Sequence, residues 1–368
     1  MSFSAVILTA CSPYTQEQSS NLTDKKQFRI FPVTFCNNLD PIFFHILLLF
    51  HMNHAPAFQF PSKKWLRLFT LCILLIITVF ISIRYYHIHN HGLNWINNHT
   101  ENQNQWNLPR WEDNSLWLPH YEFDISGKPV DGIKNNLSGL SYAYDRDQLI
   151  AIINSPPEII TLNTQGEIIH RYPIIGANDT EGIAYLGSNR VAVLQEKRRS
   201  IIIIELPLAN HTPITVSEEN AYTLHIPDDR NNGPEGIAYV PHTDTLYIVK
   251  ERLPVGLYAV QGLLHTPQHA TQTDLSHWLA QMPFATDLSS IDYDPVHQHL
   301  VLLSDEAQML MTITTDGQLV NYLDLAPFEF RLPPPQPEGV AIGPDGAVYI
   351  VSEPNLFYRL VHRTRLVQ

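Results

Sequence analysis

The sequence predicts an all-β protein, a five-bladed β-propeller, preceded by one transmembrane helix. Three observations predict this fold: five repeats of similar pattern, almost no helical periodicity within them, and one uncharged apolar run upstream. The repeats align on one small residue, and successive aligned positions lie 43, 54, 54 and 49 residues apart, at Gly139, Gly182, Gly236, Ser290 and Gly339. This spacing is typical of propeller blades, which carry four short strands each.

Each repeat reads as two or three β-strands separated by turn residues, for example EGIAY, the turn LGSN, VAVLQE and SIIIIEL in the second repeat. Only residues 273–281 suggest a helix of two turns. Residues 116–126 (LWLPHYEFDIS) precede the first repeat and look like a lone strand. We expect this strand to pair into the last blade and close the ring, because an open edge leaves backbone groups unpaired. A degenerate sixth blade within residues 212–224 or 262–284 is the alternative.

The apolar run covers residues 68–83 (LFTLCILLIITVFISI) and contains no charge. With its aromatic flanks it reaches residues 65–86, about 20 residues, which is long enough to span a bilayer core. Lys63, Lys64 and Arg67 precede the run and only Arg84 follows it closely. The positive-inside rule therefore predicts a retained signal-anchor with its C-terminal side across the membrane. A cleaved signal peptide is the rival interpretation, but no small-x-small cleavage site follows the run.

The anchor divides the chain into four predicted parts. Residues 1–62 form a cytoplasmic or mis-annotated segment, 65–86 the anchor, 87–110 an Asn/His-rich tether, and 111–368 the propeller. Met52 opens a segment that resembles an ordinary cytoplasmic leader (MNHAPAFQFPSKKW). We hypothesise that translation starts at Met52.

Charge and cysteine usage exclude several function classes. Residues 1–86 carry a net charge of +4, and the rest of the chain carries −17. So acidic a domain repels phosphate backbones, which argues against nucleic-acid binding, and its field favours cations. The cysteines, Cys11, Cys36 and Cys72, all precede or lie in the anchor. The predicted propeller therefore has no disulfide and no thiolate metal site.

Acidic residues recur at two fixed positions of the repeats. Three repeats carry a glutamate just before the aligned glycine, where the other two have Ser138 and Ser289. A second polar residue lies 14 or 15 residues after the aligned position, where the next strand ends. Repeat symmetry places equivalent residues in a ring about the axis. The resulting candidate metal ligands are Glu181, Glu235 and Glu338 in one ring, and Asn154, Glu196, Glu251, Asp305 and Glu353 in the other.

Up to seven carboxylates would then converge at one end of the propeller. Hard oxygen ligands without cysteine suit Ca²⁺ or Mg²⁺, and six to eight oxygens favour Ca²⁺. A purely architectural role for the Glu-Gly pairs is the competing interpretation. Basic residues beside the acids can neutralise them or hold an anionic ligand, namely Lys197, Arg198, Lys250 and Arg252.

At these positions the sequence resembles the YjiK/CarP family, also called the SdiA-regulated family, over about residues 116–366. The resemblance rests on NLSGL at 136–140, NSPPEI at 154–159, EGIAY at 181–185, KERxP at 250–254 and PEGV at 337–340. It implies a single-pass or secreted bacterial β-propeller, a periplasmic face on the inner (plasma) membrane, and a connection to calcium. The fourth repeat, with Ser289 and Ser290 in place of Glu-Gly, departs from the pattern and argues against a strictly fivefold ligand set.

These observations favour an envelope propeller that binds a divalent cation, Ca²⁺, and serves as a binding or sensing module, with a role in calcium homeostasis. Its expected partners are the inner membrane, the cation, and an envelope protein or small anionic ligand. A metal-dependent hydrolase of the lactonase or esterase-like phytase type is the alternative, with Glu235, Glu338, Glu251 and Glu353 as candidates. The sequence has no G-x-S-x-G or HExxH motif. An interaction scaffold that needs no ion is a third possibility.

Overall fold

The structure is a computed structural model of the full chain. It describes residues 63–85 and the greater part of the region from 106 to 365, namely 106–217, 219, 221–227, 233–252, 254–282, 285–326 and 333–365. The predicted N-terminal segment 1–62, including the proposed start at Met52, and most of the tether lie outside the described residues.

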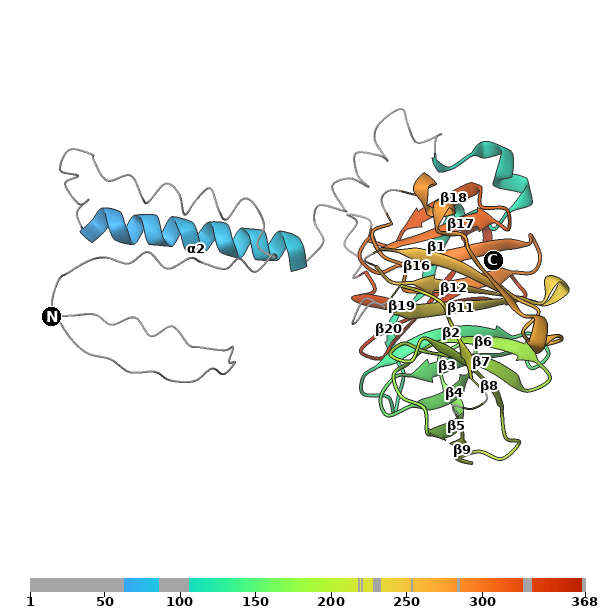
Figure 1. The fold of residues 1–368 in the computed structure, drawn as a ribbon. Helices are drawn as coiled ribbons and strands as arrows, with labels where there is room; N and C mark the ends of the chain where they lie inside the picture. Colours follow the sequence, from blue (N-terminus) through green and yellow to red (C-terminus); the bar gives the residue numbers. More distant parts are fainter. Residues whose placement is uncertain are drawn as a thin grey trace, which may run out of the picture. The chain divides into compact units, whose positions relative to one another are not determined.

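Five sheets, each with four antiparallel strands, form the five blades of a propeller, as predicted (Figure 1). The first three blades run from the inner strand outward in sequence order. The first comprises β2 (Leu137–Ala143), β3 (Gln148–Ile153), β4 (Glu158–Leu162) and β5 (Ile168–Ile175). The second comprises β6 (Thr180–Gly187), β7 (Arg190–Gln195), β8 (Ser200–Glu205) and β10 (Tyr222–Thr223), and the third β11 (Pro234–Val240), β12 (Thr245–Lys250), β13 (Gly256–Gln261) and β14 (Thr271–Asp274).

The last two blades repeat this order, except that the chain's first strand completes the fifth. The fourth blade comprises β15 (Ser290–Asp294), β16 (His299–Ser304), β17 (Met309–Thr314) and β18 (Leu319–Asp324). The fifth comprises β19 (Gln336–Ile342), β20 (Val348–Glu353), β21 (Leu356–His362) and β1 (Tyr121–Pro129).

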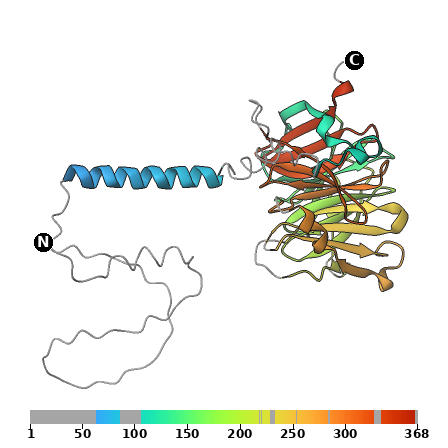
Figure 2. The same cartoon turned by 90° about the horizontal axis from the view of Figure 1, so that it is seen from above.

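The ring closes between the two ends of the propeller sequence. Strand β1 pairs antiparallel with β21, with Tyr121 opposite His362. In Figure 2 the turquoise segment that leads into β1 lies beside the red C-terminal strands. The predicted closing strand is therefore confirmed, although it starts five residues later than 116. Leu116 and Leu118 instead lie in or beside the short 3₁₀ helix η2 (Leu118–His120), where both are buried.

The regions considered for a sixth blade belong to existing blades. Within residues 212–224, β9 (Ile214–Thr215) pairs parallel with β5, and β10 is the outer strand of the second blade. Within residues 262–284, β14 completes the third blade and is followed by the 3₁₀ helix η6 (Ser276–Gln281). The described parts of these regions therefore build no sixth sheet, and a 3₁₀ helix takes the place of the helix suggested at 273–281.

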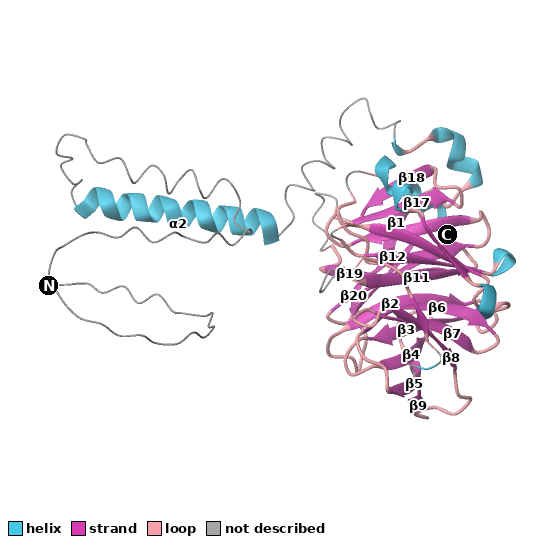
Figure 3. Cartoon of the chain, viewed as in Figure 1, coloured by secondary structure: helices cyan, strands magenta, loops and turns pink. Residues whose placement is uncertain are grey.

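Strands dominate the described part of the propeller, and the helices there are short 3₁₀ segments (Figure 3). Besides η2 and η6 they are η1 (Pro109–Asn114), η4 (Pro241–Thr243), η5 (Pro267–His269) and η7 (Arg363–Arg365). Apolar clusters of buried side chains fill all five interfaces between neighbouring blades. Because both faces of a blade are covered, strands such as TLYIVK read as continuous apolar runs.

The inner strands β2, β6, β11, β15 and β19 contact one another in a ring. The aligned glycines explain how they approach so closely. A Cβ atom on Gly182 would lie 2.6 Å from the backbone oxygen of Glu235 in the next blade, and one on Gly139 would lie 2.6 Å from that of Glu181. Ser290, at the same position in the fourth blade, accepts a hydrogen bond from the backbone N–H of Val340 at 3.2 Å. The small residue is therefore an architectural requirement of the ring.

Residues Lys63–Tyr85 form helix α2, as predicted from the apolar run. Large apolar side chains on this helix are exposed, among them Leu68 (53%), Phe69 (64%) and Leu71 (66%). Within the residues that the structure describes, no helix combines the length and the apolarity needed to cross a membrane. The prediction of a helix is therefore confirmed. The prediction that this helix spans a membrane is not confirmed.

Candidate cation site

Both predicted rings lie at the same end of the propeller because the first two strands of a blade are antiparallel. The inner strand begins where the second strand ends, so Glu181 at the start of β6 lies near Glu196, which directly follows β7. The backbone N–H of Glu196 donates to the carbonyl of Asp179 at 2.9 Å, and that of Glu251 donates to Gly233 at 3.2 Å. In the fifth blade Glu353 pairs with Gln336.

A β-bulge sits at each Glu-Gly pair. The register of the inner strand shifts between Thr180 and Ile183, between Pro234 and Gly236, and between Pro337 and Gly339. In each case the extra residue is the glutamate of the first ring or its neighbouring glycine. The fourth blade has no Glu-Gly pair, and β15 pairs with β16 without a shift. The first blade, which has Ser138 before Gly139, also has a shift, between Leu137 and Leu140. The bulge therefore accompanies the aligned glycine and not the glutamate alone.

Where serine replaces the glutamate, its hydroxyl joins neighbouring blades. Ser138 Oγ donates to the backbone oxygen of Glu181 at 3.0 Å, and Ser289 Oγ donates to that of Pro337 at 2.6 Å. These two positions are therefore architectural. The architectural interpretation concerns the Glu-Gly pairs rather than these serines, and for Glu181, Glu235 and Glu338 it stays a hypothesis.

Glu181 is buried, with 9% of its surface exposed, and its two carboxylate oxygens have separate partners. Ser138 Oγ donates to Oε2 at 2.9 Å, and Asn154 Nδ2 donates to Oε1. Asn154, itself a predicted ligand, is thus hydrogen-bonded to Glu181, another predicted ligand. Burial raises the pKa of Glu181 to about 8; the Ser138 hydrogen bond opposes the shift, and the negative charges of Glu196, Asp179 and Glu353 add to it.

Glu235 and Glu338 are half-buried at the starts of β11 and β19. Burial raises the pKa of both well above the ordinary value of 4.5. The charges of Glu181, Glu338, Glu196 and Glu251 raise that of Glu235 further, and those of Asp305, Glu181, Glu353 and Glu251 raise that of Glu338. Residues from blades two to five thus act on one another, so the predicted carboxylates share one electrostatic environment at the axial end.

Burial is the first cause of a raised pKa at all seven predicted carboxylates, which are Glu181, Glu196, Glu235, Glu251, Asp305, Glu338 and Glu353. Like charges in a desolvated site disfavour ionisation unless a cation compensates them. We call this set, together with Asp179 of the second blade and Asp287 of the fourth, the axial acidic cluster.

The tightest group in the axial acidic cluster is Asp179, Glu181 and Glu196, all in the second blade. One carboxylate oxygen from each lies within 4.8 Å of the others. Oxygens bound to one Ca²⁺ at 2.3–2.6 Å are separated by at most about 5 Å, so this spacing fits a shared ion. Glu196 Oε1 accepts the backbone N–H of Gly233 at 3.0 Å. Lys197 Nζ lies 2.9 Å from Asp179 Oδ2, and its own side chain is 62% exposed.

In the third and fourth blades, protein groups contact Glu251, Glu306 and Asp287. Arg252 bridges Glu251 and Glu306, with Nη1 2.7 Å from Glu306 Oε1. Asp287, 1% exposed, accepts the Ser304 hydroxyl and the backbone N–H groups of Asp305 and Glu306 at 3.0 and 3.1 Å. Burial raises its pKa to about 6, and burial also raises that of Asp305 to about 7. The rings are therefore chemically unequal around the axis.

Basic residues beside the cluster have different surroundings. The fully buried Lys250 donates from Nζ to the backbone oxygens of Arg252 and, at 3.2 Å, Pro254. Arg198 donates from Nη1 to the backbone oxygen of Gly176 at 3.1 Å and to Gln195 Oε1 at 3.2 Å. Lys197 and Arg252 contact acids directly, as the scaffold interpretation expects.

Sequence reasoning missed Asp179 and Asp287. Both are the first residue of their repeat, two positions before the first ring, where the other repeats have Asn136, Gly233 and Gln336. The repeat alignment contains this third position. Only two of the five residues at this position are acidic, so the repeat pattern there is weak.

Several solved structures are similar to this chain in part. They include a luciferin-regenerating enzyme (14% identity, 64% of this chain and 95% of that chain, TM-score 0.43) and a streptogramin B lyase (14%, 66% and 98%, TM-score 0.37). The glutaminyl cyclase of Myxococcus xanthus is another (11%, 66% and 95%, TM-score 0.44). Likenesses this distant carry no argument about chemistry.

The family comparison is more specific. The model of the family described as SdiA-regulated matches residues 113–361, which covers all five blades and both rings. This confirms the resemblance seen in the sequence motifs. The chain belongs to the SdiA-regulated family.

Proposed function

We propose that the axial acidic cluster binds a divalent cation, Ca²⁺ in preference to others, and that the protein serves as a binding or sensing module. One observation carries the proposal: oxygens of Asp179, Glu181 and Glu196 lie within 4.8 Å of one another in a site where burial raises the pKa of Glu181 to about 8. A cation between these oxygens removes the repulsion and allows the carboxylates to ionise.

The donor set favours Ca²⁺ over softer metals and over Mg²⁺. Carboxylates are the available ligands, and the propeller sequence contains no cysteine. Ca²⁺ accepts six to eight oxygens in flexible geometry, whereas Mg²⁺ demands a near-ideal octahedron. Glu235 and Glu338, whose pKa values rise partly through the charge of Glu181, would supply further oxygens or stabilise the ion from a distance.

The proposal includes a setting for this module. The apolar sequence 68–83, its flanking Lys63, Lys64 and Arg67, and the exposed apolar side chains of α2 support a signal-anchor in the bacterial inner membrane, with the propeller on the periplasmic side. Calcium bound at the axial end would attract an anionic ligand or an acidic surface of an envelope protein. Lys197, at the rim of the cluster and 62% exposed, supports such a contact.

One observation keeps the hydrolase alternative in view. Glu181 and Asp305 have pKa values raised by burial to about 8 and about 7, close to neutrality, as general acids and bases require. A bound ion would act as the Lewis acid, and Glu235, Glu338, Glu251 and Glu353 are the further candidates.

Titration calorimetry of the purified full-length chain with Ca²⁺ and Mg²⁺ tests the binding proposal. The informative variant is Glu196→Gln, which keeps an oxygen to accept the Gly233 N–H. The matched control is Glu167→Gln, whose side chain is 66% exposed in an outer turn. We expect Ca²⁺ to bind the parent and the control, and to bind the Glu196 variant at least tenfold more weakly. No Ca²⁺ binding by the parent would overturn the proposal.

A screen of lactones and phosphoesters with Ca²⁺ separates the two functions. Turnover that needs Ca²⁺ and is lost in Glu235→Gln would make the protein a hydrolase. Ca²⁺ binding without turnover supports the module.

A further inference from the structure

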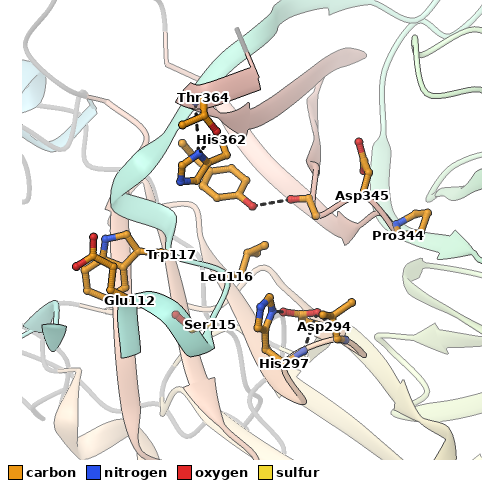
Figure 4. Close-up of a pocket in the computed structure, with 13 residues that line it drawn as sticks. Glu112, Ser115, Leu116, Trp117, Asp294, His297, Pro344, Asp345, His362 and Thr364 are labelled. Atoms are coloured by element: carbon orange, nitrogen blue, oxygen red, sulfur yellow. Dashed lines mark hydrogen bonds and ion pairs between the residues drawn. The ribbon is translucent and has the colours of Figure 1, made fainter. Parts of the chain in front are cut away.

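A pocket of about 390 Å³ lies at the end of the propeller opposite the axial acidic cluster. It is lined by Asp294, the last residue of inner strand β15, and by Pro344, which follows the end of inner strand β19. The acidic cluster lies at the beginnings of these strands. The segment before β1 and the C-terminal residues after β21 complete the wall (Figure 4). Its volume falls within the range of small-molecule sites.

The hydroxyl groups of the pocket are already engaged by protein acceptors. Tyr121 Oη donates to the backbone oxygen of Gly346 at 2.8 Å. Ser115 Oγ donates to that of Trp111 at 2.8 Å and accepts from Asn321 Nδ2 at 3.2 Å. These bonds hold the N-terminal segment against the fourth and fifth blades. They also leave these two hydroxyls without a proton for a ligand.

Asp294 and His297 form one wall of the pocket. Asp294, whose side chain is 2% exposed, lies with Oδ2 2.5 Å from Nδ1 of His297, and its Oδ1 accepts the backbone N–H of Val296 at 2.9 Å. Figure 4 shows the pair joined in the pocket. The pair therefore fixes the turn between β15 and β16 at the wall of the pocket.

The charge of the lining is negative. Besides Asp294, the pocket contains Glu112 and Asp345, whose side chains are 48% and 42% exposed. Arg359 Nη2 lies 3.8 Å from Asp345 and offsets part of its charge. Among the described lining residues there is no lysine or arginine. The walls between the polar groups are apolar, with Leu116, Trp117 and Pro344.

We propose that this pocket binds a small organic cation, an ammonium or guanidinium group on a short apolar chain. The cationic donors would bond to the carboxylates of Glu112 and Asp345, which line the pocket. The apolar chain would lie against Leu116 and Trp117, whose indole also attracts cations. An anion is repelled by the same carboxylates, and a neutral alcohol gains only the apolar contact.

Ligand-observed NMR and calorimetry with the full-length chain test this inference, using agmatine and butylammonium as probes. Butyrate and butanol are the matched anionic and neutral probes. We expect the two cations to bind and the other two probes to show at least tenfold weaker binding. Equal binding of cation and alcohol, or no binding of either cation, would overturn the proposal. Binding of an end-blocked arginine peptide, with no binding of agmatine, would also overturn the proposal.

Two variants locate the binding. Glu112→Gln removes a pocket charge on an exposed side chain, so folding is not at risk, and it should weaken agmatine binding severalfold. Asp345→Asn, which keeps an oxygen for the backbone N–H of Ala347, should do the same. Glu196→Gln, at the opposite end, should leave agmatine binding unchanged. If agmatine binding is lost in the Glu196 variant and kept in the Glu112 variant, the cations bind in the axial acidic cluster. That result would refute the proposal that they bind in the pocket.

Discussion

Replacing Glu181 by glutamine removes one buried charge from the axial acidic cluster without changing the size of the side chain. Glutamine also keeps both contacts of the native carboxylate. Its carbonyl oxygen accepts from Asn154 Nδ2, and its amide donates to the hydroxyl of Ser138. The variant therefore isolates the effect of the charge from that of packing.

The raised pKa of Glu181 sets the size and sign of the effect. Burial raises it from 4.5 to about 8, so the unfolded chain releases this proton at a lower pH than the folded protein. Without a cation, the free energy of unfolding therefore falls as the pH rises from 4.5 through about 8, and then levels off. At about 1.4 kcal/mol per unit, the cost is on the order of 4 kcal/mol at pH 8.5 and about 1 kcal/mol at pH 5.

Thermal unfolding in the presence of EDTA measures this cost. A domain of this size shifts its melting temperature by about 2–4 °C per kcal/mol. Glu181→Gln should melt on the order of 10 °C above the parent at pH 8.5 and only a few degrees above it at pH 5. The control Glu167→Gln should match the parent at both pH values. A melting temperature of the Glu181 variant that exceeds that of the parent by the same amount at both pH values would contradict the raised pKa of Glu181.

Three further predictions concern the ring and the ion. Gly182→Ala would place a Cβ 2.6 Å from the backbone oxygen of Glu235, so it should lower the free energy of unfolding by about 1–3 kcal/mol in a urea titration. An unchanged midpoint would contradict the close approach of the strands. Lys197→Met removes the ammonium 2.9 Å from Asp179 and should tighten Ca²⁺ binding by about two- to fivefold, since exposed pairs are weak; calorimetry showing weaker binding would count against a site there. The Ca²⁺ affinity should rise from pH 6 to pH 8.5, because Asp305 and Glu181, with pKa values raised by burial to about 7 and about 8, must lose protons. A Ca²⁺ affinity that stays the same from pH 6 to pH 8.5 would contradict this prediction.

The blades were predictable because their architecture needs a small residue at one recurring position. Gly139 and Gly182 meet the backbone of the next blade, so the requirement repeats with the blade. Strands β9 and β10 were not predictable as outer strands. Each has two residues, Ile214–Thr215 and Tyr222–Thr223, which is too short for an alternating pattern to emerge. The segment between the second and third repeats therefore left room for a sixth blade that the described residues do not form.

The positions of the carboxylates were predictable from repeat symmetry, but their inequality was not. Symmetry places Glu196 and Glu251 equivalently, yet Glu251 is paired with Arg252, whereas Glu196 accepts a backbone N–H. Side-chain pairing of this kind depends on rotamers that a repeat alignment does not contain. The opposite pocket was beyond sequence reasoning for another reason. Glu112, His297 and His362 come from distant parts of the chain and meet only after the ring closes.

The cation proposed for the second blade would lie between Asp179, Glu181 and Glu196. Crystals of the protein soaked in Ca²⁺, and in Tb³⁺ as an anomalous scatterer, test this proposal most directly. We predict an anomalous difference peak within about 2.3–2.6 Å of oxygens from all three residues, and its loss in Glu196→Gln crystals. Saturating Tb³⁺ that leaves no peak at this end of the propeller, or a peak coordinated only by other residues, would contradict it.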